Sequence, residues 1–330
     1  MKRIMGRFCV GAAFALAAAA SAPAWSQAPV EIRFGNHYET NHPNNQCGAD
    51  FISKEVNEAG AAVKLSIFPA AQLGTAPEMV EQLAIGELEM AMATPADLGA
   101  WFEPMSVMDA AYAFDDFSQV EKFVASERGR KLYDDVLKKT NVRIIGTWLY
   151  GTRHMTANKP IRTPDDLKGL KVRVPNAPIM LANVSAMGGR PTPMAFGEVY
   201  LGLQQGVIDA QENPLPTIKS MKFNEVQKYV TLTGHMVATT LILVSEPLWQ
   251  KLAPAQRDAI QASVDGASKR VQKCIEDQER EIVETWRSGS GIEVVTDVDV
   301  EKFRESAVKY FSDRSRFSWA DVYADLRKGR

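Results

Sequence analysis

The chain has 330 residues and a formal net charge of −2, which is close to neutral. The first 26 residues carry three positive charges and no negative one, so the rest of the chain has a formal net charge of −5. This modestly acidic balance argues against nucleic acid or an anionic membrane surface as a partner, because both attract strongly basic proteins. The length is sufficient for two lobes of ordinary domain size.

The first 26 residues have the three parts of a secretory signal peptide. The positive start contains Lys2, Arg3 and Arg7. The apolar run from Val10 to Ala20 follows, and it is too short to span a bilayer. Small residues surround a cleavage point at its end. We therefore expect this leader to be removed and the mature chain to be exported to the periplasm.

Two cysteines, Cys47 and Cys274, remain in the expected mature chain, because Cys9 leaves with the leader. In an oxidising compartment such a pair forms a disulfide if the two residues lie close together. The sequence does not fix that distance. A disulfide between them and two separate thiols are therefore both open.

Strand-like and helix-like segments alternate along the chain, which favours an α/β fold. Apolar positions predict strands over 30–35, 63–68, 88–93, 142–150, 171–174, 229–234 and 239–245. They predict helices over 41–59, 77–86, 118–139, 177–187 and 197–205. A strand over 292–296 and two short helices complete the prediction.

One segment, 254–287, predicts an unusually long helix without an internal proline. At 1.5 Å per residue it approaches about 50 Å, which is longer than one lobe is wide. We expect this helix to brace two lobes. Lobe I is predicted to contain residues 27–150 and about 239–278, and lobe II residues 151–238 and about 279–330.

Arg173 is the most informative residue of the sequence. Its neighbours Val172 and Val174 predict a buried strand, and a buried guanidinium needs an anion that no acidic residue in that strand supplies. Ligands of open α/β sheets bind at the carboxyl ends of strands, and arginine suits a carboxylate. The alternative is an internal ion pair with Asp165 or Asp209.

Three further side chains have both a binding and a structural interpretation. Arg153 follows the strand over 142–150 and either completes an anion site or is a solvated loop residue. Asn213 precedes Pro214, and its amide either donates to a carboxylate or stabilises a turn. Phe196 either forms the floor of a pocket or belongs to the core.

A polar cluster after the first strand contains Asn36, His37, Glu39, Asn41 and His42. Two histidines and a glutamate suggest a metal site, but the spacing typical of metal ligands is absent. Contacts to ligand hydroxyls suit the cluster better, with helix capping for its last two residues. Sequence motifs of nucleotide binding, hydrolases and zinc proteases are also absent. The absence of these motifs leaves open a catalytic site built from residues dispersed along the sequence. For this chain we expect no cofactor, no metal and no enzymatic activity.

Three motifs occur in order along the chain, namely Asp166–Arg173, Pro191–Phe196 and Gln211–Pro214. With these motifs the sequence resembles the substrate-binding proteins of tripartite ATP-independent periplasmic (TRAP) transporters, of the dicarboxylate/sialate (DctP-like) type. The resemblance extends over essentially the whole expected mature chain.

This resemblance implies a two-lobed periplasmic binding protein fold with a ligand cleft between the lobes and a long helix bracing both. It implies a receptor, expected to be monomeric, that delivers a small organic acid to the membrane subunits of a TRAP permease. Arg173 then pairs with the ligand carboxylate, Arg153 faces the same carboxylate, Asn213 hydrogen-bonds it, and Phe196 forms a pocket wall.

Departures from the family pattern bear on the ligand. The positions at which sialate-binding relatives contact sialic acid through their first lobe correspond to Ala76, Thr94 and Asp97, which argues against sialic acid. His37 stands where those relatives have asparagine. The polar segment Asn36–Glu39 and the aromatic Trp148 suit a compact hydroxylated acid. The residues expected to contact the ligand are Arg173, Arg153, Asn213, Phe196, His37, Asn36, Trp148, Asn176 and Thr94.

We expect the ligand to be a sugar acid such as a uronate or an aldonate. Short hydroxy or keto acids, dicarboxylates and aromatic acids are the alternatives within the same class of receptor. A periplasmic enzyme that uses His37 or His154 as a base, and a sensory receptor subunit, are less favoured.

Overall fold

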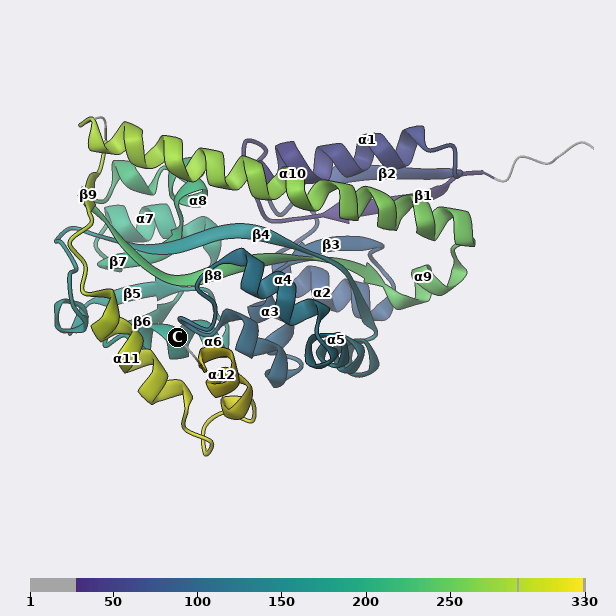
Figure 1. The fold of residues 1–330 in the computed structure, drawn as a ribbon. Coiled ribbons are helices and arrows are strands. Elements are labelled where there is room, and N and C mark those ends of the chain that lie inside the picture. Colours follow the sequence, from purple (N-terminus) through teal and green to yellow (C-terminus); the bar gives the residue numbers. More distant parts are fainter. Residues whose placement is uncertain (1–27, 290, 329–330) are drawn as a thin grey trace, which may run out of the picture.

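Two long antiparallel strands, β4 (Val142–Ala157) and β8 (Tyr229–Ser245), lie side by side through the centre of the molecule (Figure 1). The computed structural model describes residues 28–289 and 291–328. With 16 and 17 residues, the two strands are about three times the usual length. This pair of strands is therefore long enough to pair with the shorter strands at both of its ends.

Shorter strands flank this pair. They are β1 (Val30–Gly35), β2 (Val63–Phe68), β3 (Met90–Ala93), β5 (Lys171–Val174), β6 (Arg190–Pro193), β7 (Ala210–Pro214) and β9 (Glu293–Val295). The α-helices are α1 (Asp50–Glu58), α2 (Ala76–Ile85), α3 (Pro95–Gly99), α4 (Phe117–Ala125), α5 (Glu127–Thr140), α6 (Pro178–Ala186), α7 (Val199–Gln204), α8 (Leu215–Ser220), α9 (Glu246–Lys251), α10 (Pro254–Arg287), α11 (Val300–Phe311) and α12 (Ala320–Arg327). The short helical turns are η1 (Asn44–Ala49), η2 (Glu103–Asp109), η3 (Pro164–Leu167), η4 (Phe196–Glu198) and η5 (Phe223–Glu225).

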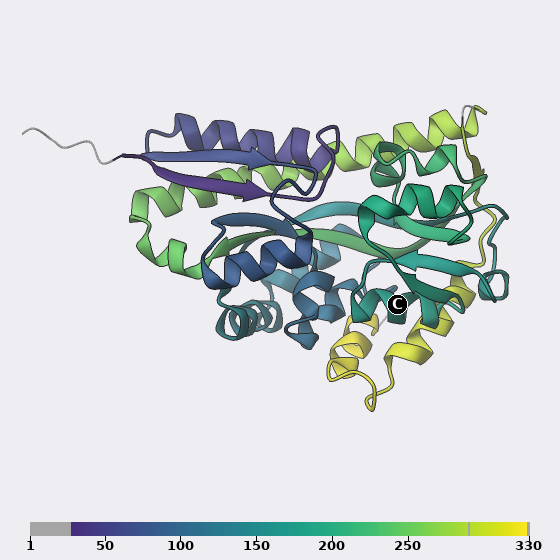
Figure 2. The same ribbon diagram turned by 180° about the vertical axis from the view of Figure 1, so that it is seen from behind.

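The strands form one mixed sheet with the order β2-β1-β3-β8-β4-β7-β5-β6, and β9 pairs with β8. Strands β1 to β3 lie at one end of the long pair and β5 to β7 at the other, which gives the molecule two lobes (Figures 1 and 2). Helices cover the sheet in both lobes. The predicted two-lobed α/β fold is confirmed, whereas the residue boundaries of the lobes stay a prediction.

Helix α10 runs along both lobes (Figure 1), as the sequence predicts for 254–287. Its buried face carries mainly apolar residues, namely Ile260, Val264, Ala267, Val271, Ile275, Ile282 and Trp286. The Cys47–Cys274 disulfide ties η1 to this helix, with the two Cα atoms 6.6 Å apart. The structure thus contains the disulfide, the first of the two alternatives that the sequence leaves open.

The predicted single helix over 118–139 is wrong. Helix α4 ends at Ala125 and α5 begins at Glu127, because Ser126 between them has an extended backbone. The Ser126 hydroxyl accepts a hydrogen bond from the Gly129 N–H at 3.1 Å, which caps the second helix. Serine inside an apolar pattern therefore marks a helix start here rather than a helix interior.

The two strands predicted over 229–234 and 239–245 are one strand, β8. The segment between them stays extended because it pairs with β4, with Val237 opposite Thr152 and Met236 opposite Arg153. The predicted leader, residues 1–26, lies outside the described residues. Within the part of the chain that the structure describes, no helix is both long and apolar enough to cross a bilayer.

Candidate functional site

Arg173 lies in strand β5, which pairs in parallel with β7 so that Arg173 is opposite Gln211. Its neighbours Val172 and Val174 are fully buried, and Arg173 itself is only 2% exposed. Both faces of this strand are therefore covered, as the sequence predicts. The arginine sits inside the protein rather than on its surface.

The Arg173 guanidinium has no acidic partner among the described residues. Its Nε and Nη2 atoms both donate to the Met194 carbonyl oxygen, at 3.1 and 2.8 Å, and its Cζ atom lies 5.7 Å from the centre of the Phe196 ring. Burial lowers the pKa of Arg173 to about 10, so the group is still charged at neutral pH. A buried charge without a partner is destabilising by several kcal/mol.

Both internal ion pairs considered for Arg173 are absent. The Asp165 carboxylate pairs with Lys168 at 2.6 Å, and the Asp209 carboxylate accepts the Lys171 backbone N–H at 2.8 Å. Because Nε and Nη2 share one carbonyl oxygen, the edge formed by Nη1 and the second Nη2 hydrogen makes no hydrogen bond within the described chain. That edge can donate two parallel hydrogen bonds to a carboxylate.

Arg153, in β4, is also buried, but its charge is already paired. Its Nη2 donates to Glu212 Oε1 at 2.7 Å, and its Nε contacts the other carboxylate oxygen. Burial would lower the pKa of Arg153, but the Glu212 carboxylate outweighs this and raises it. Of the two interpretations that the sequence leaves open for Arg153, the solvated loop residue is therefore wrong, whereas its contact with a ligand carboxylate stays a prediction.

Glu212 is the centre of a buried charged cluster. Its Oε2 lies 3.1 Å from His235 Nε2, and the other ring nitrogen of His235 is 2.8 Å from the Thr233 hydroxyl. Burial works to raise the pKa of Glu212, but Arg153 and His235 hold it well below its usual range. An acidic residue in the centre of a buried strand is the sequence signal for this partner.

Asn213, next to Glu212 in β7, has both ends of its side-chain amide engaged. Its Oδ1 accepts from Arg153 Nη2 at 3.1 Å, and its Nδ2 donates to Gln211 Oε1 at 2.7 Å. Gln211 in turn donates to the Thr156 hydroxyl. Asn213 therefore holds Arg153 in place and retains one amide hydrogen for another acceptor.

His37 and Phe196 lie together, although they are far apart in the sequence. Their ring centres are 6.1 Å apart with the rings nearly perpendicular, and Phe196 also contacts Arg173. The Nδ1 atom of His37 is buried without a hydrogen-bond partner in the described chain. Burial, together with Arg153 and Arg173, lowers the pKa of His37 to about 4, so the ring is neutral at physiological pH.

Two other predicted contacts are used within the protein. The Asn36 side chain is fully buried; its Oδ1 accepts the Tyr38 N–H, and its Nδ2 donates to Asn45 Oδ1. The Thr94 hydroxyl and backbone N–H both donate to Asp97 Oδ2 at 2.8 Å, which caps helix α3. Both residues shape the loops near the first lobe's strand ends.

The prediction for Trp148 is corrected by its packing. The ring is fully buried against Gly48, and its Nε1 donates to the Val264 carbonyl oxygen of α10 at 3.2 Å. Its one polar atom is therefore used in joining β4 to the long helix. Asn176 lies in the bend that follows β5 and is exposed.

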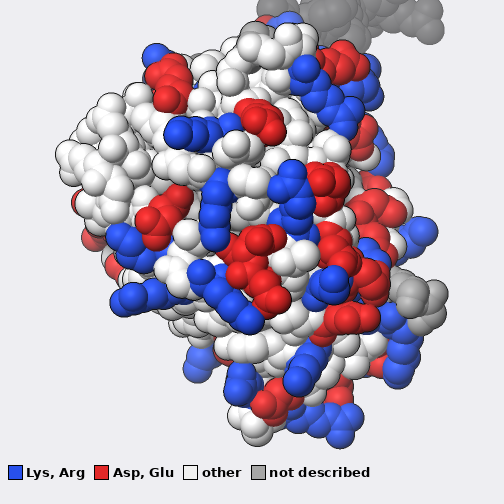
Figure 3. All heavy atoms as spheres, turned by 90° about the vertical axis from the view of Figure 1, so that its left-hand side faces the viewer, with Lys and Arg blue, Asp and Glu red and all other residues white. Residues whose placement is uncertain are grey.

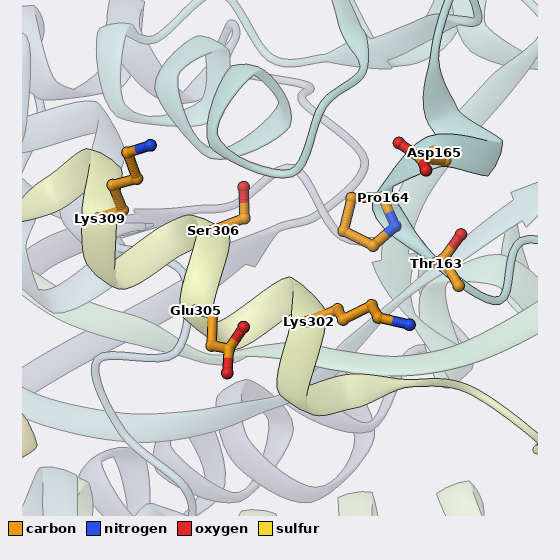
Figure 4. Close-up of a pocket in the computed structure, with 7 residues that line it drawn as sticks. All are labelled: Thr163, Pro164, Asp165, Lys302, Glu305, Ser306 and Lys309. Atoms are coloured by element: carbon orange, nitrogen blue, oxygen red, sulfur yellow. The ribbon is translucent and has the colours of Figure 1, made fainter.

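A surface groove of about 380 Å³ lies between the start of η3 and one side of α11 (Figure 4). Lys302, one of its lining residues, pairs with Asp299 at 2.8 Å, and no predicted ligand contact lines it. On the end face in Figure 3, basic and acidic side chains are interspersed. Within the described residues, no three histidine, cysteine or acidic side chains are grouped as a metal site requires.

The model of one protein family, bacterial extracellular solute-binding protein family 7 (DctP), matches residues 34–315. The chain belongs to this family. The family resemblance predicted from the three sequence motifs is thus confirmed.

Named relatives and a solved structure agree with this assignment. The solute-binding protein is 41% identical over 244 residues to the sialic acid-binding periplasmic protein SiaP of Vibrio cholerae, covering 74% of this chain and 75% of that one. It is 31% identical to the 2,3-diketo-L-gulonate-binding periplasmic protein YiaO of Escherichia coli, covering 85% of each. A TRAP solute-binding protein from Roseobacter denitrificans, solved with bound L-galactonate, superimposes with a TM-score of 0.84 at 27% identity, covering 91% of this chain and 99% of that one.

Proposed function

We propose that this protein is a periplasmic receptor that captures a small organic acid on Arg173 and delivers it to the membrane subunits of a TRAP permease. The observation that carries the proposal is the buried Arg173 guanidinium, which has a charge but no acidic partner within the described chain. A carboxylate on its open edge supplies the missing anion and two charge-assisted hydrogen bonds.

The ligand in this proposal is a sugar acid, such as an aldonate or a uronate. The L-galactonate of the Roseobacter structure, and the diketogulonate and sialic acid named for the relatives, are all carboxylic acids with several oxygen substituents. Near Arg173, the Phe196 ring offers an apolar wall, and the neutral His37 ring offers a hydrogen-bonding nitrogen. These groups suit an acid whose carbon chain carries hydroxyls.

Capture is coupled to closure of the two lobes. We place the hinge at the two strand crossings, Tyr150–Arg153 in β4 and His235–Thr239 in β8. Gly151 supports this placement. Its φ of 129° is a backbone conformation that favours glycine, and a Cβ atom at this position would lie only 2.8 Å from the Pro214 side chain. Closure excludes water, which strengthens the hydrogen bonds to the carboxylate. The ligand favours the closed state by the difference in its affinity for the two states.

Binding in this proposal is not followed by chemistry. His154, considered as a base, accepts the Gly234 N–H on its Nδ1 at 3.0 Å, so that nitrogen is occupied. The Nδ1 atom of His37 has no hydrogen-bond partner within the described chain, and in this proposal it hydrogen-bonds a ligand hydroxyl. Incubation of the protein with each bound acid, followed by NMR of the acid, is expected to return it unchanged.

A thermal-shift screen of organic acids tests the receptor function. An acid at 100 times its dissociation constant stabilises the protein by roughly 2.7 kcal/mol, which is readily measured. Sugar acids are expected to raise the melting temperature, and neutral sugars with the same hydroxyls are the control. If no carboxylic acid stabilises the protein more than its neutral counterpart, the proposal fails.

A further inference from the structure

The loop that carries His37 is held by one buried side chain of η1. Asn45 is 2% exposed, and its Oδ1 accepts a hydrogen bond from Asn36 Nδ2 at 2.8 Å. Its Nδ2 donates to the carbonyl oxygens of Tyr38 and Glu39, at 2.9 and 2.7 Å. Asn45 thus binds residues on both sides of His37 in the chain. The position of His37 therefore depends on the position of η1.

Element η1 is in turn fixed to helix α10 by a covalent bond. Cys47 lies two residues after Asn45 in η1 and forms the disulfide with Cys274 of α10. The next residue is Gly48, at which a Cβ atom would lie only 2.5 Å from the Trp148 ring of β4. Element η1 therefore packs closely against β4, and the disulfide prevents it from moving away from α10.

The winding of η1 makes this bond important for Asn45. Element η1 is a π-helix that continues directly into α1, and π-helices are rare. A π turn contains about one residue more than an α turn, so relaxation to α-helical winding would rotate the preceding residues by about 100° around the helix axis. Such a rotation would turn the Asn45 side chain away from the loop that carries His37.

We propose that the Cys47–Cys274 disulfide positions the ligand site, and that it acts on His37 through Asn45. The inference rests on the proposed function, in which His37 Nδ1 hydrogen-bonds a ligand hydroxyl beside Phe196. A loop that is already ordered in the ligand-free protein favours tight binding, because binding then does not have to order it. Asn45 and the two cysteines are positioning residues, since they act on the ligand through His37.

A double-mutant cycle between the disulfide and His37 tests this role by calorimetry on the full mature protein. The probes are L-galactonate, D-gluconate and D-galacturonate, and the cycle uses the one that binds most tightly. Cys47→Ser/Cys274→Ser is expected to weaken binding about tenfold, and so is His37→Ala in the wild-type background. In the serine background, His37→Ala is expected to weaken binding by no more than about a further twofold, because the histidine is already misplaced.

The loop is not expected to unfold when the disulfide is removed. The backbone N–H groups of Ala70 and Ala71 still donate to the carbonyl oxygens of Tyr38 and Asn36, each at 2.9 Å. The pair of serines therefore displaces the His37 ring but leaves Arg173 in place. Binding becomes weaker in this variant, whereas Arg173→Met is expected to abolish tight binding.

Val136→Ala is the control for a general loss of stability. Val136 is fully buried in α5, which lies across the sheet from α10 (Figure 1). This variant creates a cavity in the core of the same lobe, and it is expected to preserve both the affinity and the effect of His37→Ala. Circular dichroism establishes that each variant is folded. If Val136→Ala weakens binding as much as the two serines do, the disulfide acts through stability alone and the inference fails.

Three other results would overturn the inference. They are affinity within about twofold of wild type in the folded serine variant, an equal effect of His37→Ala in both backgrounds, and no effect of His37→Ala in wild type. In each case, binding that is lost in Arg173→Met leaves the receptor function intact. If none of the three acids binds the wild-type protein, the inference fails together with the sugar-acid assignment.

Asn45→Ala, which keeps the disulfide, decides the question if the serine variant does not fold. Its removal of the three hydrogen bonds to the loop is expected to weaken binding about tenfold and to cancel the effect of His37→Ala. Wild-type affinity in a folded Asn45→Ala protein would show that η1 does not position His37.

Discussion

Replacing Arg173 with methionine separates a ligand-binding arginine from a structural one. Methionine keeps an unbranched side chain of similar reach but removes the charge and the donors. Because Arg173 has no acidic partner in the described chain, its removal leaves no buried protein carboxylate unpaired. The substitution is therefore expected to abolish tight binding without unfolding the protein.

The magnitude of both effects follows from the burial of Arg173. Losing one partner of a buried ion pair costs about 3–5 kcal/mol, which weakens binding roughly 100-fold to several thousand-fold. In the ligand-free protein, the substitution is expected to raise rather than lower the folding stability, because it removes a buried charge without an acidic partner. Burial lowers the pKa of Arg173 from its usual range to about 10, which corresponds to a penalty of the order of 3 kcal/mol for the charged form. Loss of the two hydrogen bonds to Met194 offsets part of this, at about 1 kcal/mol each.

The assay combines calorimetry with urea unfolding. Calorimetry gives the dissociation constant of the tightest acid from the thermal-shift screen, and unfolding without ligand gives the stability of each variant. Arg190→Met is the control, because Arg190 begins the neighbouring strand β6 and is exposed. The control is expected to change neither quantity by more than about 0.5 kcal/mol.

Two results would refute the reasoning. Affinity within tenfold of wild type in Arg173→Met means that the ligand carboxylate lies elsewhere. A loss of more than about 3 kcal/mol of stability in the ligand-free variant means that Arg173 is mainly structural.

The other predictions concern stability. Arg153→Met is expected to destabilise the protein by about 3–5 kcal/mol, because it removes the guanidinium that pairs with both oxygens of the buried Glu212 carboxylate; an effect below about 1 kcal/mol in urea unfolding would contradict that pairing. Gly48→Ala should lower stability by about 1–3 kcal/mol, since the new Cβ would lie 2.5 Å from the Trp148 ring; unchanged thermal unfolding would argue against this packing. Burial raises the pKa of Asp109 to about 7, so the folded protein binds this proton more tightly than the unfolded chain does. Relative to Asp109→Asn, wild type should therefore gain stability as the pH falls from 7 towards 4, by up to about 1.4 kcal/mol per pH unit. A pH-independent difference between the two proteins would rule this out.

Local patterns were sufficient to predict much of the fold. The alternation in 30–35 and 63–68 and the uninterrupted pattern of 254–287 give β1, β2 and α10 with the observed bounds. The prediction of two separate strands over 229–234 and 239–245 was wrong because the continuity of this strand depends on pairing between distant segments. The middle of β8 has no strand signal of its own beyond its neighbours, and it stays extended because β4 lies beside it.

In the site, too, local sequence was sufficient for some residues, whereas others depend on distant segments. The burial of Arg173 could be predicted from its own strand, because its valine neighbours carry that information. The state of Arg153 could not, because Glu212 approaches from a different strand through the β4–β7 pairing. Trp148 likewise has its contacts on α10, more than a hundred residues away along the chain.

A crystal structure of the protein with the acid that binds most tightly tests the central claim most directly. The account predicts both ligand carboxylate oxygens at about 3 Å from the Nη1 and Nη2 atoms of Arg173, with Arg153 still bound to Glu212. A ligand whose carboxylate pairs with any other group, while Arg173 keeps only Met194 as its partner, would contradict it.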